Sequence, residues 1–364
     1  MYSVKVDLRD NPYEIMIGRD ILGSLGQHLQ PLKIGTDAII ITNPVIHKYH
    51  GKTLARGLKS AGFTCKFMEV PSGEKSKSVQ SALKIIRELV NYGAVRRPFI
   101  IAFGGGVVGD LAGFVAAIYK RGIPYLHVPT TLLAQIDSAI GGKVAVDLPV
   151  GKNLIGAFYQ PRLVYSDITL LSTLSRRQIV NGLAETVKYG IIADKFLFHY
   201  IEMNIRQLLD LNPATMAEVI FSCSRIKARV VTNDERETKG IRTILNFGHT
   251  IGHAIEAADR FRHYQHGEAV ALGMRVAADI SRRMKMLNAN EARNIGQVLT
   301  RLGLPEQISH VTFRNIMQYM QYDKKFLARK NRFVLATGIG SVKVLEGIDR
   351  KVIRSAIHAF LKKK

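Results

Sequence analysis

Short apolar runs alternate with amphipathic stretches over the first half of the chain. Four runs are bounded by turn residues and have the length of buried strands: 38–41, 66–70, 99–103 and 125–128. Stretches with helical periodicity, such as 78–90, lie between these runs. Because strands that alternate with helices usually pair in parallel, the pattern predicts a mostly parallel sheet with helices on both faces.

The pattern changes near residue 175, where helical periodicity replaces the short apolar runs. The predicted helical segments are 178–189, 213–231, 249–258, 268–284 and 289–302. The clearest strand-like run in this half is 332–336. We therefore predict an α/β domain over residues 1–172, followed by a mainly α-helical domain over residues 173–364.

The composition of this 364-residue chain argues against several classes of protein. Its longest apolar candidate, 99–119, is interrupted by consecutive glycines and by Asp110, so we expect no membrane-spanning helix. Charged residues within the first ten positions argue against a secretory signal. Cys65 and Cys223 lie far apart without metal-ligand spacing, which predicts two reduced thiols in a cytoplasmic protein.

The net charge of +23 allows three explanations: nucleic-acid binding, an anionic substrate, or a basic host proteome. Lysine and arginine are spread along the whole chain, and no arginine-rich arm, aromatic-interleaved stripe or recognition motif occurs. We therefore expect a small-molecule substrate and no nucleic-acid partner.

A glycine-rich motif, GGGVVGD at Gly104–Asp110, follows the predicted strand 99–103 and begins an apolar helix. It matches G-x-G-x-x-G, in which glycines let the backbone approach a pyrophosphate at a helix N-terminus. The motif is not in the first strand–helix unit, and no acidic residue ends a strand about twenty residues later, unlike the dinucleotide-binding pattern. A tight structural turn is the alternative, although three glycines at a strand-to-helix junction favour phosphate binding.

Polar residues also follow the next predicted strand. Thr130 and Thr131 follow 125–128 after one proline, where hydroxyl groups either face a ligand crevice or cap a helix. A glycine-rich stretch then carries one carboxylate, two lysines and one amide: Asp137, Lys143, Lys152 and Asn153. Lysine and asparagine can bind phosphate oxygens, and solvated surface residues are the alternative.

Two later segments carry groups that suggest a functional site, the second of them with metal-ligand spacing. Glu185 and Lys188 share a helix face, and their largely apolar neighbours favour a site over a surface ion pair. His249 and His253 occupy positions i and i+4 of a predicted helix, and His266 follows with carboxylates nearby. Spacing alone selects His249 and His253 as the metal-binding pair.

Together these segments closely resemble the 3-dehydroquinate synthase family, in the family's order and over nearly the whole chain. The matching segments are SGEKSKS (72–78), GGGVVGDLAGF (104–114), KRGI (120–123), VPTTLLAQIDSAIGGKVAVD (128–147), GKNLIGAFYQP (151–161), GLAETVKYGI (182–191), DERETKGIRTILNFGHTIGHAIE (234–256), HGEAV (266–270) and DKK (323–325). The resemblance implies a Rossmann-like NAD-binding domain, an α-helical metal- and substrate-binding domain, and a cytoplasmic homodimer.

The resemblance also implies roles for individual residues. It assigns a divalent metal, zinc or cobalt, to Glu185, His249 and His266, and makes His253 a substrate ligand instead. The implied NAD contacts are Thr42, Asn43, Glu74, Lys77, Gly105, Gly106, Val107, Val108, Gly109, Asp110, Thr130, Thr131, Asp137, Lys143 and Lys152. The implied phosphate ligands are Lys152, Asn153, Asn246, His253, one of Lys324 and Lys325, and Arg121 from the second subunit. Lys227 and Arg242 would bind the substrate carboxylate, and Lys188 would contact substrate hydroxyls.

The implied reaction converts 3-deoxy-D-arabino-heptulosonate 7-phosphate to 3-dehydroquinate and phosphate. It proceeds by transient oxidation with NAD, β-elimination of phosphate, reduction and intramolecular aldol closure. Ser76 and Ser175 depart from the family pattern, at positions without an assigned role. A related sugar phosphate cyclase and a metal-dependent polyol dehydrogenase stay open as alternatives. A polyol dehydrogenase would not need Lys143, Lys152, Lys227 and Arg242 together.

Overall fold

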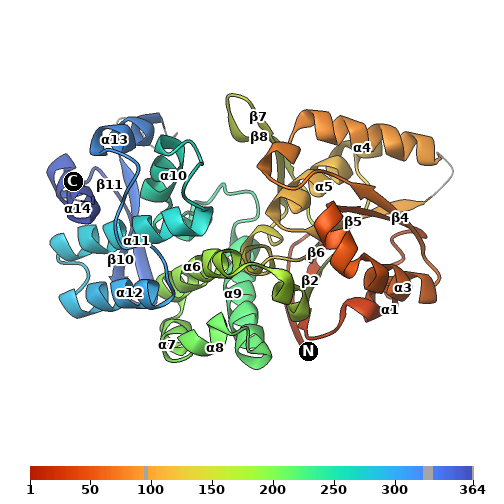
Figure 1. Cartoon of the computed structure of the whole chain (residues 1–364), viewed down its shortest axis with the longest axis horizontal. Coiled ribbons are helices and arrows are strands. Elements are labelled where there is room, and N and C mark those ends of the chain that lie inside the picture. The colour runs from red at the N-terminus through yellow and green to blue at the C-terminus, as the bar shows by residue number, and fades with distance from the viewer. Residues whose placement is uncertain (94–96, 323–330, 363–364) are drawn as a thin grey trace. The chain divides into compact units, whose positions relative to one another are not determined.

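The computed structural model describes residues 1–93, 97–322 and 331–362, and the chain forms two compact units (Figure 1). Unit 1 contains Met1–Ser175 and Pro213–Arg236, and unit 2 contains Arg176–Asn212 and Glu237–Lys364. The predicted boundary at residue 172 lies near the first crossing between the units. The chain also returns to unit 1 for one long helix, α9 (Pro213–Asn233).

A seven-stranded sheet forms the core of unit 1, in the order β1-β2-β9-β6-β5-β3-β4. Its strands are β1 (Tyr2–Val6), β2 (Tyr13–Gly18), β3 (Asp37–Thr42), β4 (Thr64–Glu69), β5 (Pro98–Gly104), β6 (Tyr125–Pro129) and β9 (Leu163–Asp167). β1 and β2 pair antiparallel, whereas the other neighbours pair in parallel. The predicted mostly parallel sheet is therefore confirmed, with an antiparallel hairpin at one edge that was not predicted.

Helices cover both faces of this sheet (Figure 1). α4 (Val79–Tyr92) and α5 (Gly106–Ile118) pack on one face, and α1 (Leu25–Leu29) and α3 (Lys52–Ser60) pack on the other. The interior strand β3, flanked by β4 and β5, has the sequence DAIIIT and is buried along its whole length. Such a continuous apolar run is typical of a parallel strand covered on both faces.

The remaining elements of unit 1 are short, apart from α9. They are η1 (Leu22–Ser24), η2 (Gln30–Leu32), α2 (Pro44–Ile46), η3 (His47–Gly51), η4 (Glu74–Ser76), η5 (Tyr119–Arg121), η6 (Ala134–Ser138), η7 (Ile168–Thr173), and the antiparallel hairpin β7 (Lys143–Leu148) and β8 (Gly151–Phe158). The long helix α9 (Pro213–Asn233) packs against β1, β2 and η6, burying Val219, Ile220 and Cys223. This packing explains why α9 belongs to unit 1 although it lies among helices of unit 2 in the sequence.

Unit 2 is mainly helical, as predicted. Its elements are α6 (Arg176–Ala193), α7 (Lys195–Met203), α8 (Ile205–Leu209), η8 (Ile241–Asn246), α10 (His249–Ala258), α11 (His266–Arg283), α12 (Ala289–Arg301), α13 (Phe313–Tyr322), α14 (Arg350–Phe360) and the hairpin β10 (Arg332–Gly338) and β11 (Ser341–Glu346). The central helix, α11, packs against α6, α10, α12 and α14. Among the described residues, no helix has the length and hydrophobicity needed to cross a membrane.

Candidate active site

Several residues predicted to contact NAD lie at the carboxyl ends of neighbouring strands in unit 1. Thr42 ends β3, Gly105 follows β5, and Thr130 follows β6. The strand order reverses at β3, because β4 lies on one side of it and β5 on the other. In open α/β sheets, the crevice at such a reversal is where ligands bind. The buried hydroxyl of Thr42 has no hydrogen-bond partner among the described residues, which leaves it available to a ligand.

The glycine-rich turn brings β5 close to the first turn of α5. A Cβ atom on Gly104 would lie 2.6 Å from Cβ of Val108, and one on Gly105 would lie 3.0 Å from Cγ2 of Thr131. Gly105 is the N-cap residue of α5 and has no side chain to cap the free N–H groups of the first turn. A helix N-terminus of this kind favours an anion such as a pyrophosphate.

Lys77 is buried and gathers polar groups from three other segments of unit 1. Its ammonium group lies 2.5 Å from the Asp110 carboxylate and 4.0 Å from that of Asp147, and it donates to the Asn153 side chain. The backbone of Asn153 has a φ of 56°, a conformation that asparagine tolerates, and its N–H donates to Asp147 at 2.8 Å. Burial raises the pKa of Asp110, and the Lys77 ammonium opposes this shift. Asp147 was not predicted to belong to this cluster.

A second ion pair of unit 1 involves one of the two predicted carboxylate-binding residues. Lys227 on α9 pairs with the Asp137 carboxylate, and its ammonium group also donates to the Asp137 carbonyl oxygen at 2.7 Å. The other predicted residue, Arg242, is buried in η8 of unit 2, with Nε 3.6 Å from Glu237. Because Lys227 and Arg242 belong to different units, their joint action rests on the family resemblance.

Three other predicted cations have exposed side chains in unit 1. Lys143 begins β7, Lys152 lies on β8, and Arg121 ends η5. Lys152 forms an ion pair with Glu74 at 3.0 Å. Both Lys324 and Lys325 lie outside the described residues.

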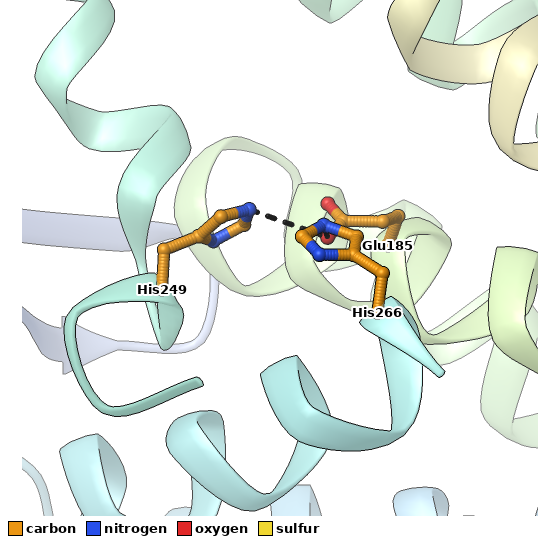
Figure 2. Close-up of side chains that lie close together, drawn as sticks. All are labelled: Glu185, His249 and His266. Atoms are coloured by element: carbon orange, nitrogen blue, oxygen red, sulfur yellow. Dashed lines mark ion pairs between the residues drawn. The ribbon is translucent and has the colours of Figure 1, made fainter. Parts of the chain in front are cut away.

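In unit 2, three predicted metal ligands converge from three helices (Figure 2). Glu185 lies on α6, His249 begins α10, and His266 begins α11. The Nε2 atoms of both histidines lie 3.4 Å from Oε1 of Glu185. Donors that share one tetrahedral zinc ion, at bonds of about 2.0–2.2 Å, are about 3.3–3.6 Å apart. The donor atoms therefore have the spacing of a metal site.

The electrostatics of this cluster favour a cation. Glu185 is fully buried, and its Oε2 atom is paired with the ammonium group of Lys188. Burial by itself would raise the pKa of Glu185, but an ion pair with buried Lys188, together with both histidines, holds that pKa well below its usual range. Burial would lower the pKa of His266, yet contacts with Glu185 and Glu256 raise it to about 10. A buried carboxylate that stays ionised and has two histidine nitrogens 3.4 Å from one oxygen suits a divalent metal.

Glycines allow the three helices to approach closely enough to form the cluster. A Cβ atom on Gly267 would lie 2.1 Å from the Asn181 carbonyl oxygen of α6, and one on Gly273 would lie 1.9 Å from the Gly248 carbonyl oxygen. The Gly267 N–H also donates to the Asn181 side chain at 2.5 Å. Because Glu185 lies one turn beyond Asn181, this contact brings the first residue of α11 beside Glu185.

His253 occupies a different position from the one predicted by spacing alone. Its exposed ring lies edge-on to that of His249, with ring centroids 5.2 Å apart, whereas the donor group that contains Glu185 and His249 is completed by His266. The spacing prediction of His249 and His253 as the metal pair is therefore corrected in favour of His266. Asn246, a predicted phosphate ligand, ends η8 shortly before α10.

Sequence reasoning gave no role to Glu256, which lies beside this cluster. Oε1 of Glu256 is 3.4 Å from Nδ1 of His266, and Glu256 forms a second group of possible donors with His253 and His266. Its positions three and seven residues after His253 and His249 place it on their helix face. That spacing was the signal that could have revealed it.

The two-unit fold is shared by a broader group, because a crystal structure of an iron-containing alcohol dehydrogenase matches the chain with a TM-score of 0.66 at 14% identity. The match to a sugar phosphate cyclase is closer. A crystal structure of 2-deoxy-scyllo-inosose synthase, complexed with carbaglucose-6-phosphate, NAD⁺ and Co²⁺, matches this chain with a TM-score of 0.89 and 28% identity. The match covers 99% of this chain and 100% of that one. The predicted fold class, a Rossmann-like domain with a mainly α-helical domain, is confirmed.

Sequence comparisons identify the family within this class. Family models described as 3-dehydroquinate synthase N-terminal and C-terminal match residues 67–181 and 182–326. The 3-dehydroquinate synthase of Pelotomaculum thermopropionicum is 42% identical over 99% of this chain and 97% of its own length. That of Idiomarina loihiensis is 43% identical over 98% of this chain and 99% of its own length. The chain belongs to the 3-dehydroquinate synthase family, which confirms the resemblance.

Proposed function

We propose that this chain converts 3-deoxy-D-arabino-heptulosonate 7-phosphate to 3-dehydroquinate and phosphate. The observation that carries this proposal is the buried cluster of Glu185, His249 and His266, whose donor spacing of 3.4 Å suits one divalent metal in a chain of this family. Bound NAD would supply reversible hydride transfer, and zinc or cobalt would act as the Lewis acid on the substrate alcohol. The protein would contribute positioning and electrostatic stabilisation.

Unit 1 would hold NAD at the carboxyl ends of β3, β5 and β6. The free N–H groups at the start of α5 would face the pyrophosphate, with the buried Thr42 hydroxyl nearby along the same sheet edge. Lys77 and Asp110, already paired with each other, would order the loops around the dinucleotide. This arrangement supports the assignment of NAD binding to unit 1.

Unit 2 would hold the metal and orient the reacting hydroxyl groups. Lys188 is buried beside Glu185, so its ammonium group would donate to a substrate oxygen close to the metal. By the family resemblance, the substrate phosphate would bind Lys152 and Asn153 of unit 1, Asn246 and His253 of unit 2, and one of Lys324 and Lys325. Lys227 and Arg242 would bind the substrate carboxylate, because fixed cations recognise this group through charge-assisted hydrogen bonds.

A second candidate is the cyclisation of a hexose phosphate, because the 2-deoxy-scyllo-inosose synthase structure holds carbaglucose-6-phosphate. A hexose phosphate has no carboxylate, so it would leave Lys227 and Arg242 without their proposed ligand. We therefore favour the heptulosonate phosphate.

The test is an assay of both substrates with purified enzyme and a trace of NAD. With the heptulosonate phosphate, phosphate and 3-dehydroquinate should appear in equal amounts, and many turnovers should occur for each NAD. Glucose 6-phosphate should release no phosphate. Phosphate release from glucose 6-phosphate alone would overturn the assignment.

We also propose a cytoplasmic homodimer in which Arg121 serves the phosphate site of the second subunit. The exposed position of Arg121 in η5, together with family membership, supports this role. Inactive Arg121→Ala protein mixed with inactive Glu185→Ala protein should regain activity, because the mixed dimer contains one complete site. Lys120→Ala is the matched control and should be active alone. No activity after subunit exchange verified by mass would mean that Arg121 acts within its own chain or has no role.

A further inference from the structure

His266 has a partner on the side of its ring that faces away from Glu185. Nε2 of His266 lies 3.4 Å from Glu185, and Nδ1 lies 3.4 Å from Oε1 of Glu256. Glu256 is buried on α10, and its carboxylate contacts the His266 ring. Burying a carboxylate is costly unless the group is paired, and the contact with His266 supplies such a pairing.

The positions of the protons on the imidazole ring determine what this contact does. A neutral imidazole has one N–H donor and one lone pair. If Nε2 of His266 gives its lone pair to a metal, Nδ1 must carry the proton and needs an acceptor. Glu256 provides an acceptor at this position, because an ionised carboxylate only accepts.

We infer that Glu256 is a positioning residue for the metal site: it accepts the Nδ1 proton of His266 and so fixes the tautomer and orientation of that ring. This inference rests on the metal site of the proposed function and deepens it. An outer carboxylate of this kind also makes the imidazole a stronger ligand, and its loss typically lowers metal affinity about 10- to 100-fold.

The other histidine is oriented by different means. Nδ1 of His249 lies 3.1 Å from the Phe247 carbonyl oxygen, so its proton is held by the backbone just before α10. Both imidazoles therefore direct Nε2 toward Glu185, but their Nδ1 atoms have different partners. The partner of His249 is a neutral backbone carbonyl, and the partner of His266 is a carboxylate. A side-chain substitution can remove only the second.

The backbone of His266 is anchored independently of Glu256. Gln265 and Glu268 form a capping box at the start of α11, and Arg177 binds the Glu268 carboxylate through two contacts of 2.7 Å. Removing the Glu256 carboxylate should therefore free the His266 ring without unravelling the helix. This separation makes the inference testable by metal binding.

A second metal at His253, Glu256 and His266 is the competing interpretation, because these donors also lie close together. The 3.4 Å distance suits two ligands of one ion as well as a long hydrogen bond, so distance alone does not decide. The number of ring protons distinguishes the two interpretations. With one metal on Nε2, a second metal on Nδ1 would require His266 to lose both ring protons and to bridge two cations. The positioning role requires no such charge on the ring.

The experiment compares Glu256→Gln and Glu256→Leu with the native chain. Asp279→Asn is the matched control, because Asp279 is another carboxylate of unit 2, on the same helix as His266, and pairs with Arg282 and Arg283. Each protein is stripped of metal and titrated with Co²⁺ against a chromophoric chelator, while the visible absorption of bound Co²⁺ is recorded. Thermal unfolding of the metal-free proteins reports on folding.

We expect one Co²⁺ per chain in every protein. Glu256→Leu should bind it about 10- to 100-fold more weakly, with a changed Co²⁺ spectrum. Glu256→Gln should bind with intermediate affinity, because its amide oxygen still accepts the Nδ1 proton, and Asp279→Asn should match the native chain. If Glu256→Leu fails to fold, the reduced affinity of Glu256→Gln decides.

Two results would overturn the inference. One is native affinity and spectrum in the Leu variant, or in the Gln variant should the Leu variant not fold. The other is two Co²⁺ per native chain with one lost in both variants, which would assign Glu256 to a second metal site. Neither readout needs turnover. A native chain that binds one metal but releases no phosphate would contradict the proposed reaction and leave this inference standing.

Discussion

The two units carry their candidate functional residues in different electrostatic surroundings. In unit 1, residues predicted to bind NAD or substrate are paired with each other: Lys77 with Asp110, and Asp137 with Lys227. In unit 2, Oε2 of the buried Glu185 pairs with Lys188, and Oε1 faces the Nε2 atoms of His249 and His266 at 3.4 Å. Ligand binding in unit 1 would therefore exchange existing ion pairs, whereas a metal in unit 2 would bind at Oε1 beside an ion pair that stays intact.

The difference follows from the elements that carry these residues. In unit 1 the paired side chains come from separate segments: Lys77 follows η4, Asp110 lies in α5, Asp137 in η6 and Lys227 in α9. In unit 2 they lie on helices held together by close glycine contacts, so their side chains have little freedom to form other pairs. Single substitutions should therefore impair metal binding strongly, whereas substitutions in the NAD site should act mainly by breaking ion pairs.

The largest expected effect is the loss of metal in His249→Ala. Removing this imidazole leaves two ligands, Glu185 and His266, so metal uptake and turnover should be abolished. His253→Ala should keep its metal and lose phosphate elimination, because His253 is exposed and lies outside the Glu185 group. Elemental analysis after dialysis checks both. Equal metal loss in the two variants would contradict the assignment of His253.

The next effect concerns the ion pair between Lys77 and Asp110. Lys77→Ala leaves a largely buried carboxylate without its cation and should lower the free energy of unfolding by about 3 kcal/mol. Lys152→Ala breaks the exposed pair with Glu74 and should cost less than about 1 kcal/mol. Urea unfolding of the NAD-free proteins measures both values. Equal losses would mean that burial does not distinguish the two pairs.

The proposed carboxylate-binding pair tests cooperation between the units. Lys227→Ala and Arg242→Ala should each lower the affinity for the substrate about 10- to 100-fold, since each removes a charge-assisted hydrogen bond of about 1.5–3 kcal/mol. An analogue without the carboxylate should bind the native chain and both variants alike. If the analogue loses as much affinity as the substrate, these residues shape the site instead of binding that group.

A smaller effect is expected from His127, beneath the glycine-rich turn of unit 1. Burial lowers the pKa of His127 from 6.5 to about 4. The pKa of His127 is therefore lower in the folded chain than in the unfolded chain. As the pH falls from 6.5 toward 4, the unfolded chain takes up a proton that the folded chain does not, so the free energy of unfolding decreases. Between about pH 7 and pH 5 the loss should be about 2 kcal/mol. Urea unfolding at both pH values should show a smaller decrease in His127→Gln, and an unchanged decrease would assign the effect to other groups.

Much of the fold could be predicted because periodicity is local. The predicted strand at 99–103 matches β5, and the predicted helix at 249–258 matches α10. The hairpins β1–β2 and β7–β8 were missed, because their residues do not form isolated apolar runs. The return of α9 to unit 1 was missed as well, because its packing on β1 and β2 is a contact between distant segments.

The candidate site shows the same limit. Spacing within one helix found His249 and His253, but it could not find Glu185 and His266, whose approach depends on Gly267 and Gly273 in the packing of three helices. The family resemblance supplied those residues. Glu256 was overlooked because its contact with His266 joins two helices and carries no role in the motif that was compared.

The most direct test of the central claim is a metal titration of the stripped native chain. Bound zinc or cobalt and phosphate release from the heptulosonate phosphate are measured on the same samples, with metal content verified by elemental analysis. Phosphate release should be absent without metal, should rise in proportion to bound metal and should level off at about one ion per chain, as expected for one three-ligand site. Full turnover in a sample verified to be metal-free would contradict the account.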